Sequence, residues 1–509
     1  MSGENQSEDQ QVEAAFGQLQ QRLAPLFDRI MDDNLLPRTV VVIPSLSLDD
    51  EVLQKITGVP HYEERMLSLL MLLRMPRTRV VFVTSQPLPE SIVDYYLHLL
   101  PGVPYRHARE RLVLLTCYDR TSKPLTRKIL DRPHLLARIR KAIGSTADAH
   151  MICFNVTALE RDLALALDVP IFGCDPALIS YGSKSGSRHI FTEAGVKMPD
   201  GYEDLASIDE AATALVRLKQ KHPALRRAVV KINEGFSGEG NALFSFDGAP
   251  EGPELEAWVA NHMHNLAFEA ADMTWQAFAE KFAEMQGIVE TFVEGEGKQS
   301  PSAQFRVYPG GRIEFLSSHD QVLGGPSGQQ FLGCRFPADP AYRRDIQTEA
   351  LKAAKKLAEK GVIGRFGIDF ISVPTGDGWD HYAIEINLRK GGTTHPFLML
   401  QYLTNGVYNP DNGEFTTGDG RTRFYIATDN LESDAYRGLT PDDLIDIAVC
   451  NGIHFDAANQ SGVVFHLIGA LSEYGKLGMV AIGRTPEAAQ RLYDETVAIL
   501  DHASESPDI

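Results

Sequence analysis

Residues 365–396 read RFGIDFISVPTGDGWDHYAIEINLRKGGTTHP, and the organisation of the chain can be worked out from this stretch. Two short apolar runs of strand type flank a cluster of Pro, Gly and Asp residues that is typical of a chain reversal. The two runs are Phe366–Val373 and His381–Leu388. The stretch therefore predicts a β-hairpin. If its turn centres on Asp377, Asp369 lies directly opposite Glu385, because each is eight residues from the centre.

The predicted hairpin brings acidic side chains together. Directly opposed side chains on paired strands have Cβ atoms only ~5 Å apart, so Asp369 and Glu385 repel unless a cation lies between them. Asn387 projects to the same face as Glu385. Oxygen ligands of this kind suit Mg²⁺ or Mn²⁺. A register shifted by one or two residues, with the acids facing solvent, is equally compatible with the local sequence.

Length and composition set the outer limits. A chain of 509 residues with 43% hydrophobic content predicts two to four domains with sizeable cores. The formal net charge of −19 disfavours a nucleic-acid partner and an anionic membrane surface. The five cysteines form no C-x-x-C pair, and the first residues resemble no export signal. We therefore expect a cytoplasmic protein with reduced thiols.

An N-terminal tail and helix, residues 1–35, precede a segment in which short apolar strands alternate with helices, residues 36–182. This alternation predicts a Rossmann-like α/β domain with a largely parallel sheet. The segment has no G-x-G-x-x-G after its first strand, and the whole chain has no G-x-x-x-x-G-K-[ST] loop. If the protein binds phosphate, it must do so through a different kind of binding site.

Two lysines suggest where a phosphate-binding site could lie. Lys184 begins a helix after a Gly and Ser entry, and Lys231 lies inside an apolar strand, where an ammonium group is costly unless an anion pairs with it. A glycine loop, residues 233–241, follows Lys231 and could cover phosphates with its backbone N–H groups. Taken singly, a snorkelling lysine and an ordinary hairpin loop explain the same residues. Their adjacency favours a phosphate site.

The order of these signals resembles the ATP-grasp superfamily. The motifs are SKSGSR (183–188), VVKINEGFSGEG (229–240), VETFVEG (289–295), SAQFRVYPGG (302–311) and EINLR (385–389). The GGTTHP tail (391–396) and residues 462–493 further resemble the pheganomycin-type peptide ligases and their bacterial relatives. The resemblance implies a multidomain α/β and α+β fold. Its parts would be a pre-ATP-grasp domain (36–182), an ATP-grasp core (183–410) with a small lobe (183–286) and a metal-binding lobe (287–410), and a small α+β C-terminal domain (411–509).

The resemblance also implies site roles. Lys184 and Lys231 would contact ATP phosphates, under a loop that includes Glu234, Gly235, Ser237, Gly238 and Gly240. Glu290, Phe292 and Val293 would contact adenine, with Glu294 or Glu296 near the ribose. Asp369, Glu385 and Asn387 would hold Mg²⁺, and Arg306, Arg389 and Lys231 would be catalytic. Independently of the resemblance, the turn after Arg389 could bind a substrate carboxylate through Gly391, Gly392, Thr393, Thr394 and His395, although a simple glycine turn explains it too.

The implied reaction joins a carboxylate of a small molecule or short peptide to an amine. ATP would phosphorylate the carboxylate, and the amine would displace phosphate from the acyl phosphate. An ATP-dependent kinase and a non-catalytic nucleotide-binding module are the alternatives, and the intact set of lysines and acids argues against the latter. Nothing in the sequence distinguishes a C-terminal domain that covers the site from one that mediates a homodimer.

Overall fold

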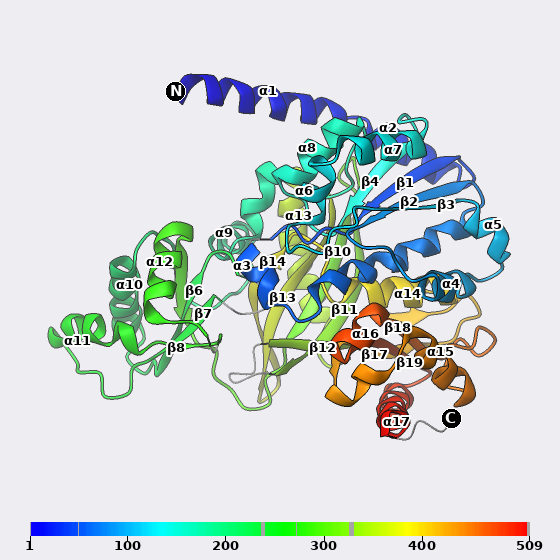
Figure 1. Cartoon of the computed structure of the whole chain (residues 1–509). Coiled ribbons are helices and arrows are strands. Elements are labelled where there is room, and N and C mark those ends of the chain that lie inside the picture. Colours follow the sequence, from blue (N-terminus) through cyan, green and yellow to red (C-terminus); the bar gives the residue numbers. More distant parts are fainter. Residues whose placement is uncertain (1, 49, 236–239, 271, 325–329, 506–509) are drawn as a thin grey trace.

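A computed structural model describes residues 2–48, 50–235, 240–270, 272–324 and 330–505 (Figure 1). Its N-terminal part contains a parallel sheet of four described strands in the order β3-β2-β1-β4. These are β1 (Arg38–Ile43), β2 (Thr78–Thr84), β3 (Leu112–Thr116) and β4 (Ala149–Cys153). Strands β1, β2 and β4 are almost entirely buried, as continuous Val and Ile runs predict for a sheet covered on both faces. The predicted parallel α/β arrangement is confirmed.

Helices pack on both faces of this sheet. The N-terminal segment predicted as a tail and helix is helical from Ser2. One of the helical segments between the strands is the 3₁₀ helix η1 (Val59–Arg74). The remaining helices of this part are α1 (Ser2–Gln20), α2 (Leu23–Asp32), α3 (Asp50–Lys55), α4 (Glu90–His98), α5 (Tyr105–Arg109), α6 (Leu125–Leu130), α7 (Pro133–Ile143), α8 (Ala158–Leu167) and η2 (Pro176–Gly182).

A second, antiparallel sheet forms a lobe that projects away from the rest of the molecule (Figure 1). Its order is β5-β9-β6-β7-β8, with β5 (Gly201–Leu205), β6 (Arg227–Ile232), β7 (Asn241–Ser245), β8 (Ala267–Phe268) and β9 (Gly287–Thr291). Its helices are α10 (Ile208–Lys221), α11 (Glu254–His262), η3 (Met263–Asn265) and α12 (Trp275–Met285). Helix α9 (Lys184–Ala194) precedes this sheet in sequence, but its Ile190 and Phe191 pack in the core of the large sheet described next. Because β9 pairs with β5 and β6, the expected lobe boundary at residue 286 cuts through this sheet, which extends to Thr291.

The third sheet is antiparallel throughout, in the order β14-β13-β10-β11-β12-β17-β19-β18. Its strands are β10 (Pro301–Val307), β11 (Ile313–Gly324), β12 (Gln330–Phe336), β13 (Gly364–Thr375), β14 (Gly378–Asn387), β17 (Phe424–Glu432), β18 (Gly462–His466) and β19 (Lys476–Gly483). Cys334 of β12 pairs with Ala427 of β17. The segment expected to be a separate C-terminal domain, residues 411–509, therefore contributes three strands to the sheet of the metal-binding lobe.

The elements beside this sheet complete the C-terminal half. They are α13 (Arg343–Glu359), α14 (Thr394–Thr404), η4 (Asp434–Gly438), α15 (Pro441–Cys450), η5 (Ile468–Ala470), α16 (Leu471–Tyr474), α17 (Pro486–Glu505) and a small hairpin of β15 (Val407–Asn409) and β16 (Glu414–Thr416). Among the residues described, no helix is long and apolar enough to cross a membrane.

The predicted hairpin is strands β13 and β14. Its turn is Gly376-Asp377, between the paired residues Thr375 and Gly378, so its centre lies half a residue before the predicted one. A bulge next to Asp369 corrects the difference: Phe370 pairs with Ala383, whereas Asp369 pairs with Glu385. The predicted pairing is therefore confirmed, and Ile384 is the extra residue of the bulge.

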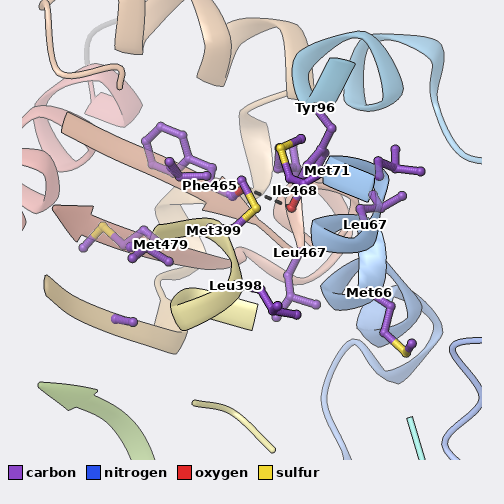
Figure 2. Packing of buried hydrophobic residues seen from close by; sticks show 14 of the residues in the cluster. Met66, Leu67, Met71, Tyr96, Leu398, Met399, Phe465, Leu467, Ile468 and Met479 are labelled. Atoms are coloured by element: carbon purple, nitrogen blue, oxygen red, sulfur yellow. Dashed lines mark hydrogen bonds between the residues drawn. The ribbon is translucent and has the colours of Figure 1, made fainter. Parts of the chain in front are cut away.

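One hydrophobic core joins the N-terminal sheet to the C-terminal strands (Figure 2). Met66, Leu67 and Met71 of η1 belong to the same cluster as Leu398 and Met399 of α14 and as Phe465 and Met479 of the large sheet. Tyr96 donates a hydrogen bond to the Phe465 carbonyl at 3.3 Å across this contact. The shared core fixes η1 against β18 and β19, which matters because η1 reaches the cavity described next.

Candidate active site

A cavity of about 620 Å³ lies between the small-lobe sheet, the large sheet, η1 and the glycine-rich turn after β14. Most of the residues predicted for a site line it: Lys184, Lys231, Gly235, Gly240, Glu290, Phe292, Val293, Asp369, Glu385, Asn387, Arg389, Gly391, Gly392 and Thr393. They come from segments between Lys184 and Thr393, and the fold brings them to one surface.

The acidic corner of the cavity is made by the hairpin. The Asn387 amide donates to Asp369 Oδ2 at 2.9 Å and to Glu385 Oε1 at 3.3 Å. The Ser302 hydroxyl of β10 donates to Asp369 Oδ1 at 2.5 Å. Burial raises the pKa of Asp369, and hydrogen bonds from Ser302 and Gln321 oppose that rise. Two carboxylates and an amide oxygen on neighbouring strands form a donor set that fits a hard divalent cation.

Two lysines, Lys231 buried and Lys184 partly exposed, face this corner. The start of α9 is fastened to the end of β6, because Ser185 N and Oγ both donate to the Asn233 side chain, at 2.9 and 2.7 Å. This contact positions Lys184, whose ammonium group forms an ion pair with the Glu385 carboxylate. Burial, together with repulsion from Lys231 and Arg389, lowers the pKa of Lys184 to about 7. Such a lysine gains from any further anion that enters the cavity.

Lys231 is 5% exposed and is not a snorkelling lysine. Its ammonium group lies 2.6 Å from Glu290 Oε1, and Arg188 donates to Glu290 Oε2 at 3.2 Å. The anion that a mid-strand lysine requires is thus Glu290 of the adjacent strand β9. Both Glu290 oxygens are engaged and its backbone lies inside the sheet between β5 and β6, so Glu290 positions Lys231 and the residues after β9 are the ones open to a ligand.

The segment after β9 departs from expectation in part. Phe292 and Val293 line the cavity, with the Phe292 ring held between the Arg227 guanidinium at 4.0 Å and the Lys298 ammonium at 4.2 Å. Glu294 instead makes a two-point ion pair with Arg227. Neither Glu294 nor Glu296 is among the described residues that line the cavity, so the geometry does not favour the ribose role expected for one of them.

Arg306 also lies elsewhere. Its guanidinium donates twice to Glu314 Oε2, at 3.0 and 2.6 Å, and packs on the Tyr308 ring. It is absent from the described lining of the cavity, whereas Ser302 and Gln304 of the same strand are present. Ser302, Gln304 and Arg306 alternate to one face of β10, because the register shift between β10 and β11 falls at Leu316 of β11. Arg306 lies further along the strand, opposite Glu314, and pairs with that carboxylate.

The glycine loop is described at its two ends. Gly235 and Gly240 line the cavity, while Glu234 is exposed and does not. Ser237 and Gly238, which were also predicted to contact phosphate, lie outside the described residues.

The turn after Arg389 divides into two parts. Gly391, Gly392 and Thr393 line the cavity, but the Thr394 hydroxyl accepts the Gly391 N–H at 3.0 Å. His395 is buried in the first turn of α14 and does not belong to the described lining. The substrate role expected for Thr394 and His395 is therefore not supported by their positions.

His395 belongs to a buried polar cluster behind the cavity wall. Its Nε2 atom lies 2.8 Å from His466 Nε2 and 3.2 Å from Asp429 Oδ1, and His466 Nε2 lies 2.7 Å from the same oxygen. Burial and the nearby His466 lower the pKa of His395 to about 4. Although burial acts in the other direction, the two histidines hold the pKa of Asp429 well below its usual range. The three side chains could also hold a metal ion, but their mutual contacts already satisfy Asp429.

Several residues that line the cavity were not predicted from the sequence as site residues. They are Tyr62 and Arg65 of η1, Phe154, Lys298, Ser302, Gln304, Gln321, Asp429 and Lys476. Arg65 lies in the PHYEER stretch, which looks like an ordinary charged helix start. Only the packing of η1 against the C-terminal strands shows that its side chain is buried. Lys476 stands directly before the apolar run 477–482, at the start of a strand, so its burial also had no local signal.

Two known protein families match parts of this chain. The family described as "IQCH-like, ATP-grasp" matches residues 176–247 and 252–411, and the "PGM1 C-terminal domain" matches residues 443–496. The chain is 30% identical over 460 residues to the L-propargylglycine–L-glutamate ligase of Streptantibioticus cattleyicolor, which spans 89% of this chain and 92% of that protein. The chain belongs to the ATP-grasp ligases. The resemblance found in the sequence and the predicted fold class are thereby confirmed.

Other relatives of this ATP-grasp ligase are more distant. IQ motif-containing protein H of Danio rerio is 23% identical over 525 residues, covering 93% of this chain and 49% of that protein. The biotin carboxylase of Campylobacter jejuni has a TM-score of 0.55 at 14% identity, covering 93% of this chain and 96% of that one. The biotin carboxylase domain of the 2-oxoglutarate carboxylase of Hydrogenobacter thermophilus has a TM-score of 0.53 at 14% identity, covering 92% and 94%. At these identities the two structures show a shared fold.

Proposed function

We propose that this protein is an ATP-dependent carboxylate–amine ligase that forms a peptide or amide bond through an acyl phosphate and releases ADP and phosphate. One observation carries the proposal. At one end of a single cavity, the cations Lys184, Lys231 and Arg389 face the oxygen donors of the hairpin. Phosphoryl transfer depends mainly on cations and positioning around the transferred group, and this arrangement supplies both.

ATP would bind along the small-lobe side. Lys184 and Lys231 would contact its phosphates, and the glycine loop that begins at Gly235 would cover them. Phe292 and Val293, which follow β9 and line the cavity, would contact the adenine. The two-point pairing of Glu294 with Arg227 and the pairing of Arg306 with Glu314 argue against including those residues.

Asp369, Glu385 and Asn387 would hold Mg²⁺ or Mn²⁺. The raised pKa of Asp369 supports this assignment, because a carboxylate that burial destabilises in its charged form gains from a cation. When bound, the metal would neutralise charge on the transferring phosphoryl group. Lys184, which touches Glu385, would turn to the nucleotide when the acid takes up a cation.

The chemistry would proceed in two steps. A carboxylate oxygen of the first substrate attacks the γ-phosphorus, and the bond to ADP breaks. The amine of the second substrate then attacks the acyl carbon, loses a proton and displaces phosphate. Arg389 would stabilise the negative charge that develops in both transition states, and its burial strengthens that interaction. Gly392 and Thr393 also line the cavity, and their backbone N–H groups would bind the substrate carboxylate.

The similar protein from Streptantibioticus cattleyicolor is named for joining two amino acids, L-propargylglycine and L-glutamate. The 30% identity over 89% of this chain supports an amino acid or short peptide as at least one substrate here.

Incubation with ATP, Mg²⁺ and pooled amino acids tests the proposal, with all products measured by mass spectrometry. The expected products are ADP, free phosphate and a condensed mass. A stable phosphorylated product without condensation would instead establish a kinase, and formation of AMP with pyrophosphate would exclude an acyl phosphate route.

A further inference from the structure

We propose that Arg65 and Lys476 bind a free carboxylate of the amine substrate, so that this substrate is an amino acid or a peptide rather than a simple amine. The inference rests on the proposed function and names the chemistry of its second substrate. The two residues come from opposite halves of the chain, η1 and the start of β19, and both line the cavity.

Arg65 is a buried cation with unused donors. It is 6% exposed, and its Nη1 donates to Asp429 Oδ2 at 3.2 Å. Its Nε and Nη2 atoms have no hydrogen-bond partner among the described residues. Leaving N–H groups of a buried guanidinium unpaired costs free energy, and a carboxylate accepting from Nε and Nη2 together would remove that cost.

The geometry around Arg65 is fixed in advance. Its guanidinium lies over the Tyr62 ring at 4.4 Å and over the Phe154 ring at 4.7 Å. Asp429, which holds Nη1, is itself held by His395 and His466. These contacts orient the guanidinium before any ligand arrives, which lowers the entropy cost of binding.

The charges nearby also require an anion. Lys476 is 5% exposed, and its ammonium group donates to the Tyr62 hydroxyl at 3.2 Å. Tyr62 therefore contacts both cations, because the Arg65 guanidinium lies over its ring. Burial and repulsion from Arg65 lower the pKa of Arg389 to about 10. Asp429 is the buried acid on this wall of the described cavity, and it is shared with the two histidines. A carboxylate between Arg65 and Lys476 would offset this repulsion.

The second substrate fits this position better than the first. The carboxylate to be activated must meet the phosphates beside Arg389 and Lys184, whereas Arg65 and Lys476 are held by the tyrosine of η1. Glu432, which lies opposite Lys476 on β17, also lines the cavity and suits the ammonium group in which an amine arrives. An amino acid presents both charges to these groups.

A competition experiment tests the inference. Wild-type enzyme receives ATP, Mg²⁺, pooled amino acids and an equal concentration of the corresponding α-carboxamides, and mass spectrometry measures the ratio of products ending in a free acid to products ending in an amide. We expect the ratio to exceed about 10, since a charge-assisted hydrogen bond contributes about that factor or more. Arg65→Met and Lys476→Met should each bring the ratio close to one. Arg120→Met, which removes an exposed cation paired with Glu473 outside the described cavity lining, should leave it unchanged.

The ratio is internal to each reaction, so a variant with reduced overall activity still reports it, and Lys476→Met serves if Arg65→Met fails to fold. Equal use of acids and amides by the wild type, or a ratio that both variants keep, would overturn the inference. If the wild type forms no condensed product, the proposed function fails. Saturation-transfer NMR with the two pools then tests the subsite alone: preferential binding of the acids that is lost in Arg65→Met supports it, and equal binding of acids and amides overturns it.

Discussion

Glu385 connects the two kinds of charge in the cavity. It lies opposite Asp369, accepts a hydrogen bond from Asn387 and forms an ion pair with Lys184. A glutamine in its place keeps the size and one acceptor oxygen but removes the charge that a metal ion requires.

We therefore expect Glu385→Gln to reduce turnover at least about 100-fold, the scale on which removing one electrostatic contact to a transition state acts. Thermal unfolding should change little, because Asn387 and Lys184 can still hydrogen-bond the amide. Asp380→Asn, an exposed acid of the same hairpin that pairs with Lys197, is the matched control and should retain activity. Near-normal turnover by Glu385→Gln would show that the metal assignment is wrong.

Glu63 of η1 offers a test through pH. It accepts hydrogen bonds from Ser85 N at 2.7 Å and Ser85 Oγ at 2.6 Å, and burial raises its pKa from 4.5 to about 7. The folded protein therefore holds a proton that the unfolded chain releases over this range. The stabilisation that this proton gives is complete below about pH 4.5 and is lost as the pH rises through 7.

Urea unfolding at pH 5 and pH 8 measures this effect. We expect Glu63→Gln to remove about 1–3 kcal/mol of the decrease in unfolding free energy that the wild type shows between the two values. The exposed Glu110→Gln should behave as the wild type does. An unchanged decrease in Glu63→Gln would mean that this carboxyl is ionised throughout.

Single residues were predictable where a local pattern made them anomalous. Lys231 stood out as an ammonium group in an apolar strand, and Asp369 and Glu385 as opposed acids. Arg65, Arg306 and His395 could not be placed in this way, because their surroundings come from other parts of the chain: β17 for Arg65, β11 for Arg306 and β18 for His395.

At the scale of elements, the hairpin shows how a prediction can be correct for a partly different reason. A two-residue turn shifts the register by one residue, and the bulge at Ile384 shifts it back at Asp369. Turn length can be estimated from Gly and Asp residues, but a bulge has no comparable signal in one sequence. Its effect is visible in the lining, where the neighbours Ile384 and Glu385 both reach the cavity.

The pairing of β6 with β9 allows stability to be separated from ligand binding. Lys231→Met leaves Glu290 buried with Arg188 as its remaining described partner, so we expect a loss of about 1–3 kcal/mol in unfolding free energy. Calorimetry should also show at least about a tenfold loss of ATP affinity, because one charge-assisted contact is removed.

The double variant Lys231→Met with Glu290→Gln is the control for this loss. It removes the buried charge that lacked a partner, so it should regain part of the stability while ATP affinity stays low. If nucleotide affinity returns with stability, or never falls in the single variant, Lys231 has a structural role only.

At the scale of the molecule, the sequence predicted the order of the parts better than their connections. The alternation of apolar strands with helices was sufficient to predict the parallel α/β arrangement of the N-terminal part. That β17, β18 and β19 extend the sheet of the metal-binding lobe depends on contacts between distant segments, such as Cys334 with Ala427, which leave no local pattern. The same long-range packing brings η1 to the cavity and creates the proposed carboxylate subsite.

The central claim is that a carboxylate is activated by phosphorylation before an amine attacks it. The most direct measurement supplies amino acids labelled with oxygen-18 in their carboxyl groups, together with ATP and Mg²⁺, and follows the released phosphate by mass spectrometry. An acyl phosphate route transfers one labelled oxygen to phosphate for each bond formed. Condensed product accompanied by unlabelled phosphate would contradict the account.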